Sequence, residues 1–64
     1  MADPALYLLE ELGRGDPAVR RAAHEDLPGA VARLRAAVRR AVDAHARGEP
    51  WPSHDALRAA VRTR

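Results

Sequence analysis

The side chains that could carry out chemistry in this sequence of 64 residues are few, and their spacing does not form a site. Of the histidines His24, His45 and His54, no two lie three or four residues apart, the spacing that brings two metal ligands together on a helix. Cysteine is absent, which excludes a thiolate nucleophile and a cysteine-bound metal. The hydroxyl side chains are Tyr7, Ser53 and Thr63. They match neither a catalytic triad nor a phosphate-binding loop, so we expect a non-enzymatic protein without metal, cofactor or small-molecule substrate.

Charged side chains offer more, because arginine guanidinium groups can pair with the phosphates of a nucleic acid. All eleven basic residues are arginine, yet the net charge is only +2. Residues 1–32 hold three arginines against six acidic residues, whereas residues 33–64 hold eight arginines against three acidic residues. The basic half therefore contains the candidate nucleic-acid-binding residues, which are Arg33, Arg35, Arg39, Arg40, Arg47, Arg58 and Arg62.

Two other interpretations of these arginines remain open. Abundant Ala and Arg without Lys are typical of a GC-rich genome, in which arginine simply covers solvated helix faces. Arg39, Asp43 and Arg47 are then spaced to form i,i+4 ion pairs. Alternatively, the acidic half packs beside the basic half, within one molecule or across a dimer.

The elements that position these side chains are predicted to be helices. The pair Asp-Pro occurs at 3–4 and at 16–17, and it favours a helix start because Asp accepts first-turn hydrogen bonds while Pro there loses no needed donor. We predict a helix over residues 4–12, ended by the glycines that follow, and another over 17–26. Their inward-facing side chains are predicted to be Leu6, Leu8, Leu9, Leu12, Val19, Ala22, Ala23 and Leu27.

A longer helix is predicted over residues 29–47, since Pro28-Gly29 interrupts the pattern before it and Gly48 and Pro50 end it. One face carries an apolar seam with alternating spacings of four and three, formed by Leu27, Val31, Leu34, Val38, Ala41 and His45. The arginines of this segment are expected on the opposite, solvated face.

A fourth helix is predicted over residues 54–63, with Ser53 as its N-cap and Leu57, Ala60 and Val61 facing inward. Residues 48–52 form an extended linker or hinge before it. Trp51, within this linker, either covers the end of the core or anchors a partner.

The apolar side chains predict a thin core, because fifteen are alanine and the larger ones include no Ile and no Phe. Chains of fewer than about 70 residues usually need a disulfide, a metal, oligomerisation or very regular helix packing. We therefore expect the seam to bind a protein partner or a second copy. The candidate partner-binding residues are Leu27, Val31, Leu34, Val38 and Trp51.

Residues 4–27, which include the stretch LLEELGRGDPAVRRAAHEDL (8–27), resemble one unit of a HEAT-type repeat. The first helix ends in Leu12, an Asp16-Pro17 turn follows, and the second helix has the family's spacing at Val19, Arg20, Ala22, Ala23 and Leu27. The resemblance implies a role in binding other proteins. A repeat unit of this family normally forms its core together with neighbouring units. The alternative to the HEAT-type interpretation is an ordinary helical hairpin.

Two shorter matches have simpler explanations. Residues 14–16 spell the integrin-binding tripeptide Arg-Gly-Asp, but Asp16 is expected to cap the second helix. Residues 47–64 are similar to the opening of a GntR-type winged helix-turn-helix, a DNA-binding family. The recognition helix and wing of that family have no counterpart in this sequence.

The sequence thus predicts an all-α fold, a small bundle of three to four short helices in one domain over residues 1–64. We expect a small helical protein that acts through protein–protein interaction, as an accessory subunit, adaptor or self-associating module. The alternative is a small nucleic-acid-associated regulator that uses the arginine-rich helix face. Residues 1–13 lack a signal-peptide pattern and no apolar run spans a membrane, so we expect a cytoplasmic protein without a membrane partner.

Overall fold

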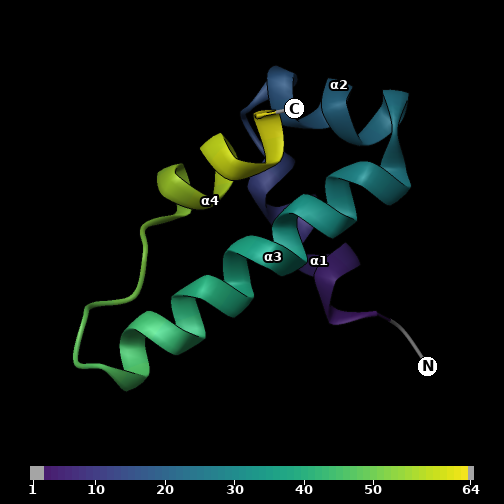
Figure 1. The fold of residues 1–64 in the computed structure, drawn as a ribbon. Coiled ribbons are helices and arrows are strands. Elements are labelled where there is room, and N and C mark those ends of the chain that lie inside the picture. Colours follow the sequence, from purple (N-terminus) through teal and green to yellow (C-terminus); the bar gives the residue numbers. More distant parts are fainter. Residues whose placement is uncertain (1–2, 64) are drawn as a thin grey trace.

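The computed structural model describes residues 3–63, which form four helices. They are α1 (Pro4–Gly13), α2 (Pro17–Glu25), α3 (Leu27–Ala46) and α4 (His54–Arg62), and this part of the chain contains no strand (Figure 1). The prediction of a small all-α bundle is confirmed. None of the helices in residues 3–63 is long and apolar enough to cross a membrane.

Each of these helices begins at a residue whose side chain accepts a hydrogen bond from the first turn. Asp3 accepts from the backbone N–H of Ala5 at 3.0 Å, and Asp16 accepts from those of Ala18 and Val19 at 3.1 and 3.3 Å. The equivalent residues are Asp26 for α3 and Ser53 for α4. Because first-turn N–H groups have no partner within the helix, these side chains fix where the helices start.

The predicted interruption at Pro28-Gly29 is wrong. Both residues belong to the first turn of α3, where Pro28 needs no N–H donor and Asp26 accepts a hydrogen bond from Gly29 at 3.1 Å. A side chain at position 29 would place its Cβ 2.1 Å from the Asp26 carboxylate, so the cap requires glycine there. Leu27 therefore starts α3 instead of ending α2, and 46% of its surface is exposed.

The core lies where α1, α2 and α4 meet the N-terminal half of α3. Its largest fully buried side chains are Leu12, Val19, Leu34 and Val61, one from each helix. The remaining buried apolar residues are Leu9, Ala30, Ala37 and Leu57. Since alanines occupy two of the buried positions on α3, the neighbouring helices can approach it closely, and the core stays small.

Two predicted core contacts are not formed. Leu6 is 44% exposed, because the inward face of α1 is centred on Leu9 and Leu12. Trp51 does not cover the core and is 55% exposed. Its indole instead stacks on the His45 imidazole, with ring centroids 4.4 Å apart.

The C-terminal half of α3 extends beyond this core. The buried residues of α3 end at Ala37, although the helix continues to Ala46. Figure 1 shows this half, in green, running away from α1 and α2, with the linker returning from its end to α4. Gly48 makes the turn with a positive φ of 93°, a conformation that glycine adopts without strain. The elongated extents of 35 × 26 × 19 Å reflect this projection.

Candidate functional site

The candidate nucleic-acid-binding arginines are mostly used within the molecule. Arg33 donates from Nε to the backbone carbonyl of Val61 at 2.9 Å, and Arg58 donates from Nε to that of Leu12 at 2.9 Å. Both side chains tie α4 to the rest of the bundle and satisfy carbonyls at helix ends. Arg33 is half-buried, so its predicted place on a solvated face is wrong.

Ion pairs also join the acidic N-terminal half to the basic C-terminal half within one molecule. Arg35 pairs with Asp3 ahead of α1, and Arg62 pairs with Asp16 ahead of α2 at 2.7 Å. Partial burial acts to raise the pKa of Asp16. The N–H donors of Val19 and Ala18 and the Arg62 guanidinium outweigh it, and they hold that pKa below its usual value. The carboxylate that caps α2 therefore also anchors α4.

The predicted ion pairs among Arg39, Asp43 and Arg47 are not formed. Arg47 pairs with Glu49 instead, at 3.2 Å. Within residues 3–63, the guanidinium groups of Arg39 and Arg40 make no hydrogen bond or ion pair. Of the seven arginines in the candidate set, these two are therefore the ones left without a partner in the described part of the chain.

The candidate partner-binding residues do not form one exposed seam. Leu34 is fully buried, while Val31 and Val38 are half-buried and pack against the core. Leu27 and Trp51 are exposed, at opposite ends of α3. A partner could reach the two ends and the flank of the seam, with Leu34 supporting that surface from beneath.

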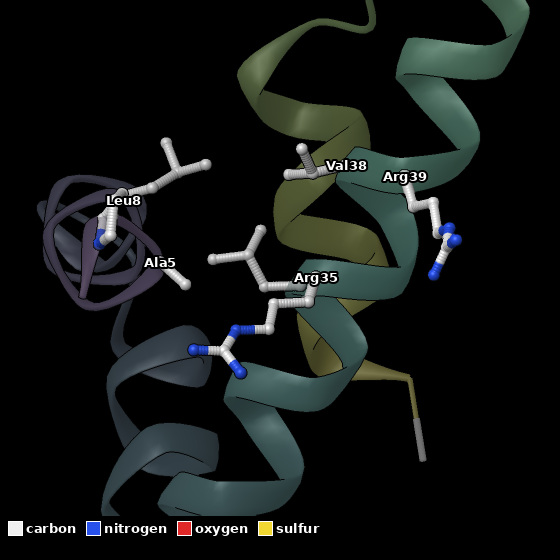
Figure 2. A pocket seen from close by; sticks show the side chains of 7 residues that line it. Ala5, Leu8, Arg35, Val38 and Arg39 are labelled. Carbon is white, nitrogen blue, oxygen red and sulfur yellow. The ribbon is translucent and has the colours of Figure 1, made fainter.

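An apolar groove nevertheless opens along this flank, between α1 and α3. It has a volume of about 270 Å³ and is lined by the apolar side chains of Pro4, Ala5, Leu8, Leu34 and Val38, with Arg35 and Arg39 at its edge. Figure 2 shows Ala5 and Leu8 extending from α1 toward α3, where Val38 stands opposite. We call this feature the α1/α3 groove.

The apolar surface continues past the groove on the projecting half of α3. Val42 lies one turn after Val38 and is 49% exposed, and His45 follows on the same face. The ring of His45 carries the stacked Trp51, and its Nδ1 lies 3.0 Å from the backbone carbonyl of Glu49. We call Val38, Val42, His45 and Trp51 the α3 strip.

Sequence reasoning missed the residues that make this surface from outside the seam, which are Pro4, Leu8 and Val42. Val42 could have been found, since it lies four residues after Val38 and flanks the seam on the side of α1. Leu8 had been assigned to the core. It is half-buried, because it packs against the core and lines the groove at the same time.

A second groove of about 260 Å³ lies between α1 and α2, where the exposed side chains of Leu6 and Leu27 meet. Its edge carries both an acid, Glu10, and a base, Arg20. This groove is confined to the α1–α2 side, whereas the α1/α3 groove runs on into the α3 strip. The longer continuous apolar surface is therefore the stronger candidate site.

Two of the three hydroxyl side chains, those of Ser53 and Thr63, make hydrogen bonds at the ends of α4. The Ser53 hydroxyl accepts from the N–H of Ala56 at 3.2 Å, and the Thr63 hydroxyl donates to the carbonyl of Ala59 at 2.7 Å. Within residues 3–63, no group of three or more histidine or carboxylate side chains is arranged to hold a metal ion.

Comparisons with protein-family models, with curated proteins and with solved structures found no match to this chain. The HEAT-type resemblance over residues 4–27 therefore stays a prediction. In the structure this segment is a helical hairpin, α1 and α2, packed on α3.

Proposed function

We propose that this chain is a small, non-enzymatic helical protein that acts through protein–protein interaction, as an accessory subunit, an adaptor or a self-associating module. Its contact surface is the α1/α3 groove together with the α3 strip. The observation that carries the proposal is a row of apolar side chains that begins with half-buried Leu8 and Val38 in the groove and goes on to Val42, 49% exposed, with Trp51, 55% exposed, stacked on His45. Contiguous apolar surface of this kind marks interaction sites in soluble proteins.

The local chemistry suits a protein partner. Trp51 offers a large apolar side chain, a type enriched among the residues that dominate binding energies. Its stacking on His45 and the flanking Pro50 and Pro52 restrict the indole before binding, so little conformational entropy is lost on contact. Arg39, which has no partner within residues 3–63, adds a charge at the edge of the groove.

The arginine contacts favour this role over nucleic-acid binding. Arg33 and Arg58 bond backbone carbonyls, and Arg35, Arg47 and Arg62 pair with carboxylates. To neutralise phosphates, these side chains would have to give up contacts that hold the helices together. Because fewer arginines are then free to contact phosphates, we expect weaker and less salt-dependent binding to DNA than the full set of seven would give.

The test is site-specific photo-crosslinking in cells that naturally express the protein. A photoreactive phenylalanine analogue replaces Val42 in one variant and Ala59, an exposed residue of α4 outside the groove, in the control. The proposal expects a discrete protein adduct from position 42 and none from position 59. Equal labelling from both positions, or none from position 42, would contradict it.

A titration of labelled duplex DNA at low and near-physiological salt tests the alternative. The proposed function expects weak binding at low salt that vanishes near physiological salt. Tight binding that Arg40→Glu weakens equally on all DNA sequences would instead assign the chain to the nucleic-acid class.

A further inference from the structure

The geometry points to a second copy of this chain as the occupant of the groove. In this dimer, α1 of each copy lies along the α3 strip of the other copy, antiparallel to that α3, and reaches into its α1/α3 groove. This inference rests on the proposed function and names its partner. It is carried by three properties of the described residues, which are the outer face of α1, the distribution of charge, and the length of the uncovered part of α3.

The first property is a second stripe on α1, next to the buried one. Pro4, Tyr7, Leu8 and Glu11 follow the spacing i, i+3, i+4 and i+7, which places them on one helix face. Tyr7 at its centre is 65% exposed, the highest value among the exposed large apolar residues of the structure. We call these four residues the α1 ridge, an apolar ridge with one acidic end.

The second property is charge complementarity between ridge and groove. α1 contains two acidic residues and no basic one, whereas the edge of the groove carries Arg39 and also Arg35, which already pairs with Asp3. Within residues 3–63, Glu11 pairs only with Arg14, at 3.3 Å, and both side chains are more than half exposed. Such surface pairs contribute little. Glu11 can therefore exchange Arg14 for Arg39 of the other copy, since Arg39 has no partner within residues 3–63.

The third property is length. The ten residues of α1 span about 15 Å at 1.5 Å per residue, and the eight residues of α3 from Val38 to His45 span about 12 Å. One α1 is therefore long enough to cover the α3 part of the strip and to reach the groove. A stable dimer usually buries roughly 800 Å² per partner. That is about a sixth of the accessible surface of this chain, which is 4600 Å².

The position of ridge and groove also satisfies the symmetry of a dimer. Pro4 and Leu8 belong to both surfaces, so the ridge borders the groove on the same molecule. In a two-fold dimer, residue i of one copy contacts residue j of the other and j contacts i. Both ridge-in-groove contacts therefore form at once. Because α1 lies across α3 (Figure 2), the two α1 helices cross each other near the symmetry axis.

The first experiment measures oligomeric state by analytical ultracentrifugation over a wide concentration range. The wild-type chain is expected to dimerise. Val42→Asp is expected to weaken the dimer on the order of tenfold or more, because it places a charge in the apolar contact. Arg21→Glu, an exposed change on α2, should leave the dimer unchanged. Circular dichroism of each variant checks that the helices are intact.

A charge exchange tests the pairing itself. Glu11→Arg and Arg39→Glu should each weaken the dimer, and the double variant should recover most of the loss because the pair is restored with reversed sign. Two single losses that simply add would overturn the Glu11–Arg39 contact and the register that depends on it.

Disulfide trapping gives a readout that does not depend on affinity, and the described chain has no cysteine of its own to interfere. Mixed Tyr7→Cys and Val42→Cys chains should form a heterodisulfide much faster than Val42→Cys chains alone. Mixed Ala59→Cys and Val42→Cys chains should react no faster than unstructured thiols. A Val42→Cys chain that pairs best with itself would overturn the antiparallel arrangement.

The outcomes separate the two proposals. A wild-type chain that stays monomeric at every concentration overturns the dimer. If position 42 then crosslinks to a different protein in cells, the proposed function stands without it. If position 42 crosslinks to nothing, both fail. A dimer that survives Val42→Asp also overturns the inference, because its interface would lie elsewhere.

Discussion

The two halves of α3 share one helix but differ in what surrounds them. As far as Ala37, just past the middle of the helix, Ala30, Leu34 and Ala37 are buried under the other helices. Beyond it, Val42 is half exposed and Trp51 stacks on His45. Packing against three helices thus holds the first half, whereas the second half faces the linker and α4. The apolar side chains of the second half are the ones available for binding.

The largest difference between the two halves is expected when one apolar side chain is removed from each. Leu34→Ala should destabilise the protein by about 2–5 kcal/mol, because it leaves a cavity in a small core. Val42→Ala should change stability by no more than about 0.5 kcal/mol. Urea unfolding of both variants, at a concentration that keeps the chain monomeric, gives the two values. Similar losses would mean that the projecting half is packed like the first.

A smaller effect is expected at Asp16, which joins α2 to α4 in the packed half. Its pKa is lowered in the folded state, so it stabilises the fold above its unfolded-state pKa, and this stabilisation is lost as the pH falls through the folded-state pKa. Asp16→Asn should therefore be less stable than wild type at pH 7, and the gap should close in acid. Urea unfolding across a pH series measures it. If the stability difference between Asp16→Asn and wild type does not change with pH, the charge of the Asp16 carboxylate does not cause it.

Next in size is a matched pair of arginines on α3. Arg33→Met removes the donor to the Val61 carbonyl and should cost about 1 kcal/mol. Arg40→Met removes a side chain without a partner in residues 3–63 and should stay within about 0.5 kcal/mol. Thermal unfolding compares the two. An equal loss for both would show that the Arg33 contact adds nothing to stability.

The smallest effect on folding is expected at Trp51, although it is the largest side chain of the chain. Because the indole contacts His45 outside the core, Trp51→Ala should change unfolding by no more than about 0.5 kcal/mol. The same variant should lower the yield of the position-42 crosslink. A strong loss of stability would mean that the linker supports the fold and would weaken the assignment of Trp51 to binding.

The starts of three helices, at Pro4, Pro17 and His54, lie where local residue patterns predict them. Asp3-Pro4, Asp16-Pro17 and Ser53 act on N–H groups two or three residues away, so no distant contact is needed to interpret them. The same rule explains the error at Pro28-Gly29. Asp26 is the N-cap of α3, and Pro28 lies in the first turn of that helix, where proline is favourable. The prediction treats this proline as a helix breaker.

The helical class, the charge asymmetry and most of the core can be predicted from the amino-acid sequence, because caps and apolar periodicity are local properties. Tertiary structure decided which arginines are free, since Arg33 and Arg58 bond carbonyls 28 and 46 residues away along the chain. It also decided which apolar side chains remain exposed. Leu6 is exposed because the inward face of α1 is centred on Leu9 and Leu12. Val42 is exposed because α1 and α2 cover only part of α3.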